Sequence, residues 1–173
     1  MAVLAIRIYP DPVLRVQCRA VTAIDDRVRK LAADMVETMH AAPGIGLAAP
    51  QVGIEERLAV VDLSVGEDPS QVHVLINPEI VHREGLETEV EGCLSLPGMT
   101  DKVDRPSAIR LKALDLSGQP IELQAEGWLA RALCHELDHL DGILFVDHLR
   151  GLRRERAKRQ LKKLAVDREE VLA

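Results

Sequence analysis

The sequence HELDH at residues 135–139 is the stretch that decides how the rest of this chain is interpreted. Two histidines four residues apart lie one turn apart on the same face of a helix, so the rings of His135 and His139 can converge on one cation. Glu136 lies about 100° around that helix, close enough to take a proton from a water molecule held by the cation. Its apolar neighbours favour a helix from about 125 to 140.

A catalytic metal site also needs a third protein ligand and an open position for water. Common metalloproteases take their third ligand from a Glu or His further along the chain. The residues that follow His139 here are poorly suited to that role. The upstream candidate is Cys93, in the sequence EGCLSLPG at residues 91–98, where glycine and proline favour a tight, exposed turn. The other two thiols, Cys18 and Cys134, are interpreted as buried and structural, and the odd count of three argues against a disulfide framework.

The size and composition of the chain are those of one globular domain. Its 173 residues suffice for one core, and we expect residues 1–173 to form a single catalytic domain. Aromatic residues are only 2% of the chain, so the core must be aliphatic. The chain shows neither a membrane-spanning run nor a signal peptide, and its net charge is −6. We therefore expect a cytoplasmic protein with no membrane or DNA partner.

The order of apolar patterns predicts an α+β fold, with a largely antiparallel sheet around a central metal-binding helix and with N-terminal and C-terminal helices. Asn77 and Pro78 are expected to end the second strand. The expected elements are a helix over 25–41, strands over 58–63 and 72–76, a hairpin of strands over 109–113 and 121–125, a helix from about 125 to 140, and a last helix from about 149 to 166.

The last expected helix is strongly basic. Eight lysines and arginines and the single acid Glu155 give residues 150–163 a charge of +7 on an otherwise acidic chain. Its leucines are too few for deep burial but are enough to lay one side on the domain; they are Leu149, Leu152, Leu161 and Leu164. A solvated basic face is the ordinary interpretation of such a helix.

Three segments together resemble the markers of the peptide deformylase family. They read GIGLAAPQ at 44–51, EGCLS at 91–95 and HELDH at 135–139, in the order that the family has, and every defining position matches. The intervals and the total length also suit the family, so the resemblance covers nearly the whole chain. One departure is Cys134, where many members carry Gln. The first segment alone is neither a P-loop nor a dinucleotide motif.

The resemblance implies a hydrolase that removes the formyl group from the formyl-methionine of new polypeptides. Cys93, His135 and His139 would bind the metal, and Glu136 would act as the base. The oxyanion would be met by the Gln51 amide and the Leu94 backbone N–H, and Gly46 would complete the catalytic set by aligning the peptide. The implied substrate-binding residues are Gly44, Ile45, Gly46, Glu91, Trp128 and Ala132.

Two supporting interactions are also expected near the ligands. Glu91 and Arg105 would pair and hold the loop that carries Cys93. Asp138 would orient one ligand histidine through its carboxylate.

The nature of the metal is approached from two directions. The general affinity order favours zinc over iron at a site of two histidines and one cysteine. The resemblance implies one divalent ion, with Fe²⁺ as the native metal, Ni²⁺ or Co²⁺ as active substitutes and Zn²⁺ as a poorer one.

The resemblance also implies N-formyl-methionyl nascent peptides as substrates, and docking of the basic helix near the ribosome exit tunnel. We expect a monomer.

Two other functions stay open at this point. A zinc endopeptidase shares the HExxH helix, but it would act on internal peptide bonds and would lack a cysteine ligand. A non-catalytic module stabilised by a metal would have no use for Glu136, Gln51 or an open coordination position.

Overall fold

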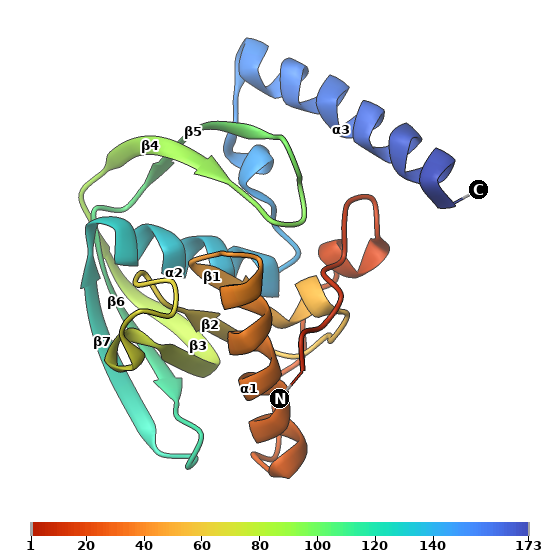
Figure 1. The fold of residues 1–173 in the computed structure, drawn as a ribbon. Helices are drawn as coiled ribbons and strands as arrows, with labels where there is room; N and C mark the ends of the chain where they lie inside the picture. Colours follow the sequence, from red (N-terminus) through yellow and green to blue (C-terminus); the bar gives the residue numbers. More distant parts are fainter. Residues whose placement is uncertain (1, 173) are drawn as a thin grey trace.

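The computed structural model describes residues 2–172, in which helix α2 lies between two antiparallel sheets (Figure 1). The larger sheet has five strands in the order β1-β2-β3-β6-β7, and the smaller is the hairpin of β4 and β5. All paired strands are antiparallel, which confirms the expected architecture around a central helix. The bounds are α2 Gly127–Leu140, β1 Gly46–Ala48, β2 Leu58–Val61, β3 His73–Glu84, β4 Glu87–Gly92, β5 Thr100–Arg105, β6 Ala108–Leu114 and β7 Pro120–Glu126.

Helices cover both faces of the larger sheet. Strand β2 is buried at every position, because Val60 packs with helix α1 (Asp26–Ala41) and Val61 packs with α2 on the opposite face. The expected helix over 25–41 is confirmed, and the Asp25 carboxylate caps it by accepting a hydrogen bond from the Val28 N–H at 3.1 Å. The hairpin of β6 and β7 is confirmed as well.

Strand β3 does not end at Asn77 and Pro78, as the sequence predicted, but continues to Glu84. The pairing with β6 shifts between Ile76 and Glu79, so the proline, which has no N–H, lies in a bulge. Asn77 takes a φ of 52°, and its side chain exchanges two hydrogen bonds with the backbone of Val21. Residues typical of a turn are thus accommodated inside the strand.

Several shorter elements were not predicted. They include β1 and the hairpin of β4 and β5, and α2 starts at Gly127 rather than 125 because β7 continues to Glu126. Four short 3₁₀ helices complete the described chain: η1 Pro12–Arg15, η2 Ala49–Val52, η3 Pro69–Gln71 and η4 Phe145–His148.

The last helix, α3, spans Gly151–Leu172, so it begins later and ends later than predicted. Leu149 precedes it and packs in a cluster with Leu14 and Phe145. Ala157 and Leu161 are the buried residues of α3, whereas Leu152 is 85% exposed, contrary to expectation. Five residues before Ala157, it lies about 140° around the helix from the packing face. No helix within residues 2–172 has an apolar stretch that could cross a membrane.

Candidate metal centre

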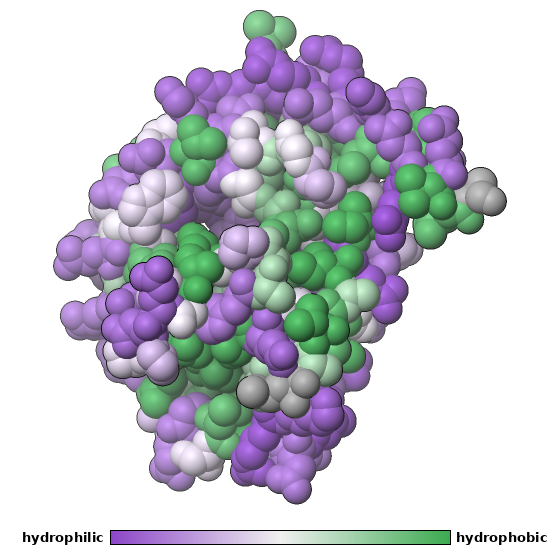
Figure 2. Space-filling view, viewed as in Figure 1, coloured by the Kyte–Doolittle hydropathy of each residue, from purple (hydrophilic) through white to green (hydrophobic). Residues whose placement is uncertain are grey.

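A cavity of about 540 Å³ opens between α2, the loop before β1, and the hairpin of β4 and β5 with the loop that follows Gly92. The space-filling view is hollowed there, and hydrophobic groups border the recess (Figure 2). Its lining brings together residues from all three marker segments. Those predicted from the sequence are Gly44, Ile45, Gly46, Gln51, Glu91, Cys93, Leu94, Trp128, Ala132, His135 and Glu136.

The three predicted ligand residues meet at the inner end of this cavity. Cys93 Sγ, one ring nitrogen of His135 and one of His139 all lie within 4.8 Å of one another. His139 Nε2 is 3.4 Å from Cys93 Sγ and 3.2 Å from His135 Nε2. The two histidines project from consecutive turns of α2, as their spacing predicts, and Cys93 follows directly after β4.

This donor set fits a first-row divalent ion. A four-coordinate ion at about 2.0–2.3 Å from each ligand holds the ligand atoms about 3.3–3.6 Å apart, close to the distances seen here. Burial lowers the pKa of His139 well below its ordinary value, so the ring is in the neutral form that binds metals. One thiol and two imidazoles are soft and borderline ligands that suit iron, cobalt, nickel or zinc.

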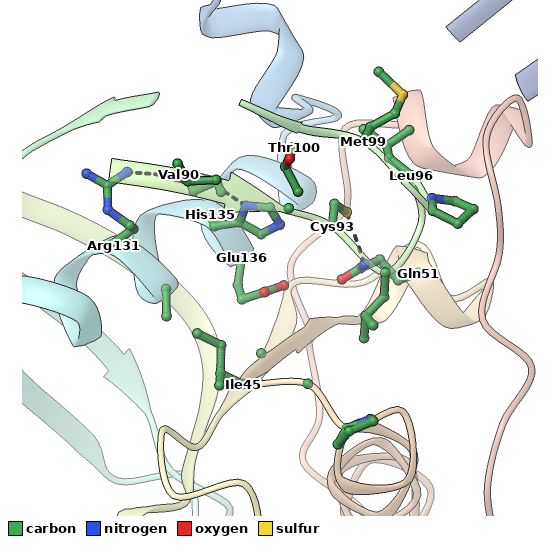
Figure 3. A pocket seen from close by; sticks show the side chains of 18 of the residues that line it. Ile45, Gln51, Val90, Cys93, Leu96, Met99, Thr100, Arg131, His135 and Glu136 are labelled. Atoms are coloured by element: carbon green, nitrogen blue, oxygen red, sulfur yellow. Dashed lines mark hydrogen bonds and ion pairs between the residues drawn. The ribbon is translucent and has the colours of Figure 1, made fainter. Parts of the chain in front are cut away.

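Glu136 lies next to His135, with its carboxylate in the cavity (Figure 3). Its Oε2 atom is buried and has no hydrogen-bond partner among the protein atoms described. Burial raises the pKa of Glu136 to about 7, which is suitable for a group that must both take and return a proton near neutral pH. The orphan oxygen therefore keeps a free acceptor position that a reacting water could use.

Gly46 at the start of β1 makes the approach to Glu136 possible. A Cβ atom at this position would lie only 2.4 Å from Glu136 Oε1. The backbone of β1 can therefore lie against the carboxylate only because residue 46 has no side chain.

Gln51 is fixed in one orientation by its neighbours. Its Oε1 accepts a hydrogen bond from the Ala48 N–H at 3.0 Å, and its Nε2 donates to Ser95 Oγ at 3.1 Å while lying 3.7 Å from Cys93 Sγ. An amide N–H is thus directed toward the ligand sulfur and the cavity. Ser95 is fully buried, and sequence reasoning assigned it no role although it lies in the second marker segment.

Glu91 is the centre of a buried ionic network. Arg105 donates to both of its carboxylate oxygens, at 2.8 and 2.9 Å, as predicted. Arg131 donates to Oε2 at 2.7 Å, and His135 Nδ1 lies 2.9 Å from Oε1. Although burial opposes its charge, the hydrogen bonds from Arg105 and His135 hold the pKa of Glu91 well below its usual range. A carboxylate only accepts, so Nδ1 of His135 carries the proton and Nε2 is free to ligate.

Two expectations about neighbouring acids need revision. Asp138 does not orient a ligand histidine: its Oδ2 accepts from Arg105 at 2.6 Å and lies 2.7 Å from His148 Nε2. It lies about 100° around the helix from His139, so its carboxylate leaves the ligand face. Glu91, expected to contact substrate, does border the cavity, but both of its oxygens are bonded to other protein groups.

The cavity walls come from more places than the sequence indicated. Ile45 and Trp128 border it and are partly exposed, and Ala132 lies deeper. Beyond Glu91 and Leu94, the other wall residues of β4 and of the loop after Cys93 were missed, as was Arg131. A buried arginine in an apolar helix is itself a signal that an acid must lie nearby. The unpredicted wall residues include Val90, Leu96, Met99, Thr100 and Arg131.

Cys18 and Cys134 lie away from the cavity lining. Both are buried, and burial raises the pKa of each thiol to about 11. They are therefore inert small apolar residues, as the sequence suggested.

Known proteins resemble this chain in sequence and in fold. The family model for polypeptide deformylase matches residues 3–155. Peptide deformylase of Alkalilimnicola ehrlichii is 54% identical over 164 residues, covering 95% of this chain and 92% of that protein. The crystal structure of a peptide deformylase from Legionella pneumophila is 42% identical with a TM-score of 0.88, covering 97% and 98% of the two chains. That from Synechococcus elongatus, in complex with actinonin, is 41% identical with a TM-score of 0.85, covering 96% and 88%.

Proposed function

Because this chain belongs to the polypeptide deformylase family, we propose that its metal is held by Cys93, His135 and His139 and that Glu136 is its catalytic base. The enzyme is a hydrolase that removes the N-formyl group from the formyl-methionine of newly made polypeptides and releases formate. The observation that carries the site assignment is the convergence of three ligand atoms within 4.8 Å beside an unpartnered carboxylate oxygen. A zinc endopeptidase and a non-catalytic module are not supported.

Proton transfer is the task of Glu136. When bound at the three ligands, a divalent ion supplies Lewis-acid chemistry that lowers the pKa of water and polarises a carbonyl oxygen. The Glu136 carboxylate takes the proton of the attacking water as the new bond to the formyl carbon forms. It then returns this proton to the amine as the C–N bond breaks. Burial keeps water other than the reactant away from the carboxylate.

Gln51 and Leu94 are proposed to stabilise the developing oxyanion. The Gln51 amide is held by Ala48 and Ser95, so it need not reorganise during the reaction. The backbone N–H of Leu94 directly follows Cys93 and is proposed as the second donor. The N-terminal segment supports both, because the Arg7 N–H donates to the Gln51 carbonyl oxygen and the Tyr9 N–H donates to that of Ser95.

The methionine side chain is proposed to enter the cavity between β1 and the first two turns of α2. Gly44, Ile45 and Gly46 offer backbone groups along one side, and Trp128 and Ala132 form the other. Glu91 is proposed to act here by orienting His135 and not by contacting the substrate directly.

Fe²⁺ is proposed as the native ion, with Ni²⁺ and Co²⁺ as active substitutes and Zn²⁺ as a poorer one. The cysteine ligand supports iron or another thiophilic ion over magnesium or calcium, which prefer oxygen. Metal content after anaerobic purification, measured by elemental analysis, separates these ions.

The partners are proposed from the substrate and from the charge distribution. The substrates are N-formyl-methionyl nascent peptides, and the basic helix α3 docks the enzyme near the ribosome exit tunnel through RNA phosphates. We further propose that the protein is a cytoplasmic monomer, that residues 1–173 act as one catalytic domain, and that it has no DNA or membrane partner.

The decisive experiment is formate release from a short formyl-methionyl peptide by enzyme of known metal content. The same peptide with an acetyl group, and one with a free N-terminus, serve as controls. We expect turnover of the formyl peptide alone. Cleavage of internal bonds in the control peptides, without formate release, would instead indicate an endopeptidase.

A further inference from the structure

The hairpin of β4 and β5 delivers Cys93, but it has few apolar contacts with α2. Along β4, Glu91 is the only buried residue, and Val90 is half exposed. On β5, Val103 packs with Leu96 and Phe145, whereas the apolar residues of α2 pack on the five-stranded sheet. Polar contacts must therefore set the distance between the hairpin and the helix.

Arg131 makes such contacts from the helix side. Its side chain is 4% exposed, and its guanidinium donates to the Glu87 carbonyl oxygen on β4 and to that of Val103 on β5, both at 2.8 Å, and to Glu91 Oε2 at 2.7 Å. One side chain thus binds both strands of the hairpin. Figure 3 shows its guanidinium directed toward the strand that carries Val90.

Arg105 makes the reciprocal connection from the hairpin side. It binds Glu91 on its own hairpin and Asp138 on α2. Arg131 and Asp138 are seven residues apart on α2, about 10.5 Å along the axis, with the ligand His135 between them. The hairpin is therefore attached to the helix on both sides of the ligand.

We propose that Arg131 is a positioning residue that sets the separation of the β4–β5 hairpin from α2. Through that separation it fixes the distance from Cys93 to the two histidines and the width of the cavity between Val90 and Trp128. The Arg131 guanidinium also lies 5.8 Å from the centre of the Trp128 ring, so the same group holds a wall residue in place. The inference rests on the proposed metal and substrate site.

The test compares two substitutions of Arg131 with a matched control. Arg131→Met keeps most of the aliphatic volume and removes all the donors; Glu91 keeps its bonds from Arg105 and His135, so no unpaired acid is created. Arg131→Lys keeps the charge, but one ammonium group cannot reach the three acceptors that the planar guanidinium group binds. Arg110→Met is the control, because Arg110 is an exposed residue of β6 paired with Glu122.

Three readouts separate positioning from general stability. Amide hydrogen exchange of residues 87–92 is measured without metal or substrate. The rate of Co²⁺ loss to a chelator is followed by the thiolate-to-cobalt absorption, and KM and kcat are determined per bound metal. For Arg131→Met we expect about tenfold faster hairpin exchange, about tenfold faster cobalt loss and a KM raised about tenfold, because three hydrogen bonds between helix and hairpin are lost while Arg105 still connects the two. The kcat should stay within about twofold, and Arg131→Lys should fall between Met and wild type.

The proposal is overturned if hairpin exchange, cobalt loss and KM all stay within about twofold of the Arg110→Met control. It is equally overturned if exchange rises as much in β2 and β3 as in the hairpin, since that reports general destabilisation. Should Arg131→Met not fold, Arg131→Lys decides by the same criteria. A wild-type protein with no thiolate–cobalt absorption and no formate release would contradict the proposed function instead, while hairpin exchange would still report on Arg131.

Discussion

Helices α2 and α3 are separated only by residues 141–150, but they are held to the protein in opposite ways. In α2, nine of 14 residues are buried, and they include the charged or polar Arg131, Glu136 and His139. In α3, two of 22 residues are buried, and most of the surface is charged. Figure 1 shows α3 at the periphery, and Figure 2 shows a predominantly hydrophilic surface there. Burial raises the pKa of the Glu136 carboxyl group, so chemistry that needs such a tuned carboxylate can be built on buried α2 and not on exposed α3.

The largest effect on metal binding and activity is expected from substituting Cys93, the one proposed metal ligand that does not lie on α2. Cys93→Ala should lose metal and formate release together, because two histidines cannot complete the site. Elemental analysis and the formyl-peptide assay measure both. Cys134→Ala, on α2 but away from the cavity, is the matched control and should keep both. A metal-loaded, active Cys93→Ala protein would remove the basis of the proposed centre.

Removal of the base should leave the metal in place. Glu136→Gln should keep a wild-type metal content and lose turnover by about 10²–10⁴, because only proton transfer is lost. Glu155→Gln on α3, an exposed acid paired with Lys158, should change neither quantity. Near-normal turnover of Glu136→Gln would exclude Glu136 as the base and weaken the contrast between the two helices.

The ionic network behind His135 should contribute to stability in a pH-dependent way. Glu91→Gln should cost about 3–5 kcal/mol at pH 7, because it leaves two arginines without their shared acid. The folded-state pKa of Glu91 lies below its unfolded value near 4.5, so its stabilisation is complete above that pH and is lost as the pH falls further.

Urea unfolding of wild type and Glu91→Gln between pH 7 and pH 3 measures this difference. The gap in unfolding free energy should narrow below about pH 4.5. The Glu155→Gln control should run parallel to wild type throughout. A gap that stays constant with pH would show that Glu91 does not act through its charge.

The smallest effect on catalysis is expected from α3. Truncation before Arg150 should leave formyl-peptide turnover within about twofold, since α3 contributes no residue to the cavity lining. Loss of Leu161 from its cluster should lower the free energy of unfolding by about 1.5–3 kcal/mol.

Co-sedimentation of the full chain with ribosomes should weaken as the salt concentration rises, and the truncated chain should bind far less. Salt-insensitive binding that survives truncation would contradict the docking proposal, and lost turnover in a folded truncate would give α3 a catalytic role.

The parts of the site that could be predicted are those fixed by local geometry. Helical spacing alone brings His135 and His139 to one face, and the tight turn explains why Cys93 was the best remaining ligand. Asp138 was assigned the wrong partner, because the sequence near the ligands does not say which acid faces them. The acid that does so, Glu91, lies 44 residues from His135 along the chain.

The missed hairpin has a related cause. Strands are found in sequences by the alternation of apolar and polar residues, but β4 reads ETEVEG and buries an acid instead of an apolar side chain. Its attachment to α2 is ionic, so it leaves no hydrophobic pattern to detect. Asn77 and Pro78 misled for the opposite reason: they are typical of turns, but here they form a bulge within β3.

Gly46 has a genetic consequence. Each single-base change of a glycine codon that alters the amino acid introduces a residue with a Cβ atom, or else a stop codon. At residue 46 that atom would lie 2.4 Å from the Glu136 carboxylate. Every amino-acid exchange that one mutation of this codon can produce therefore requires the Glu136 carboxylate or β1 to move.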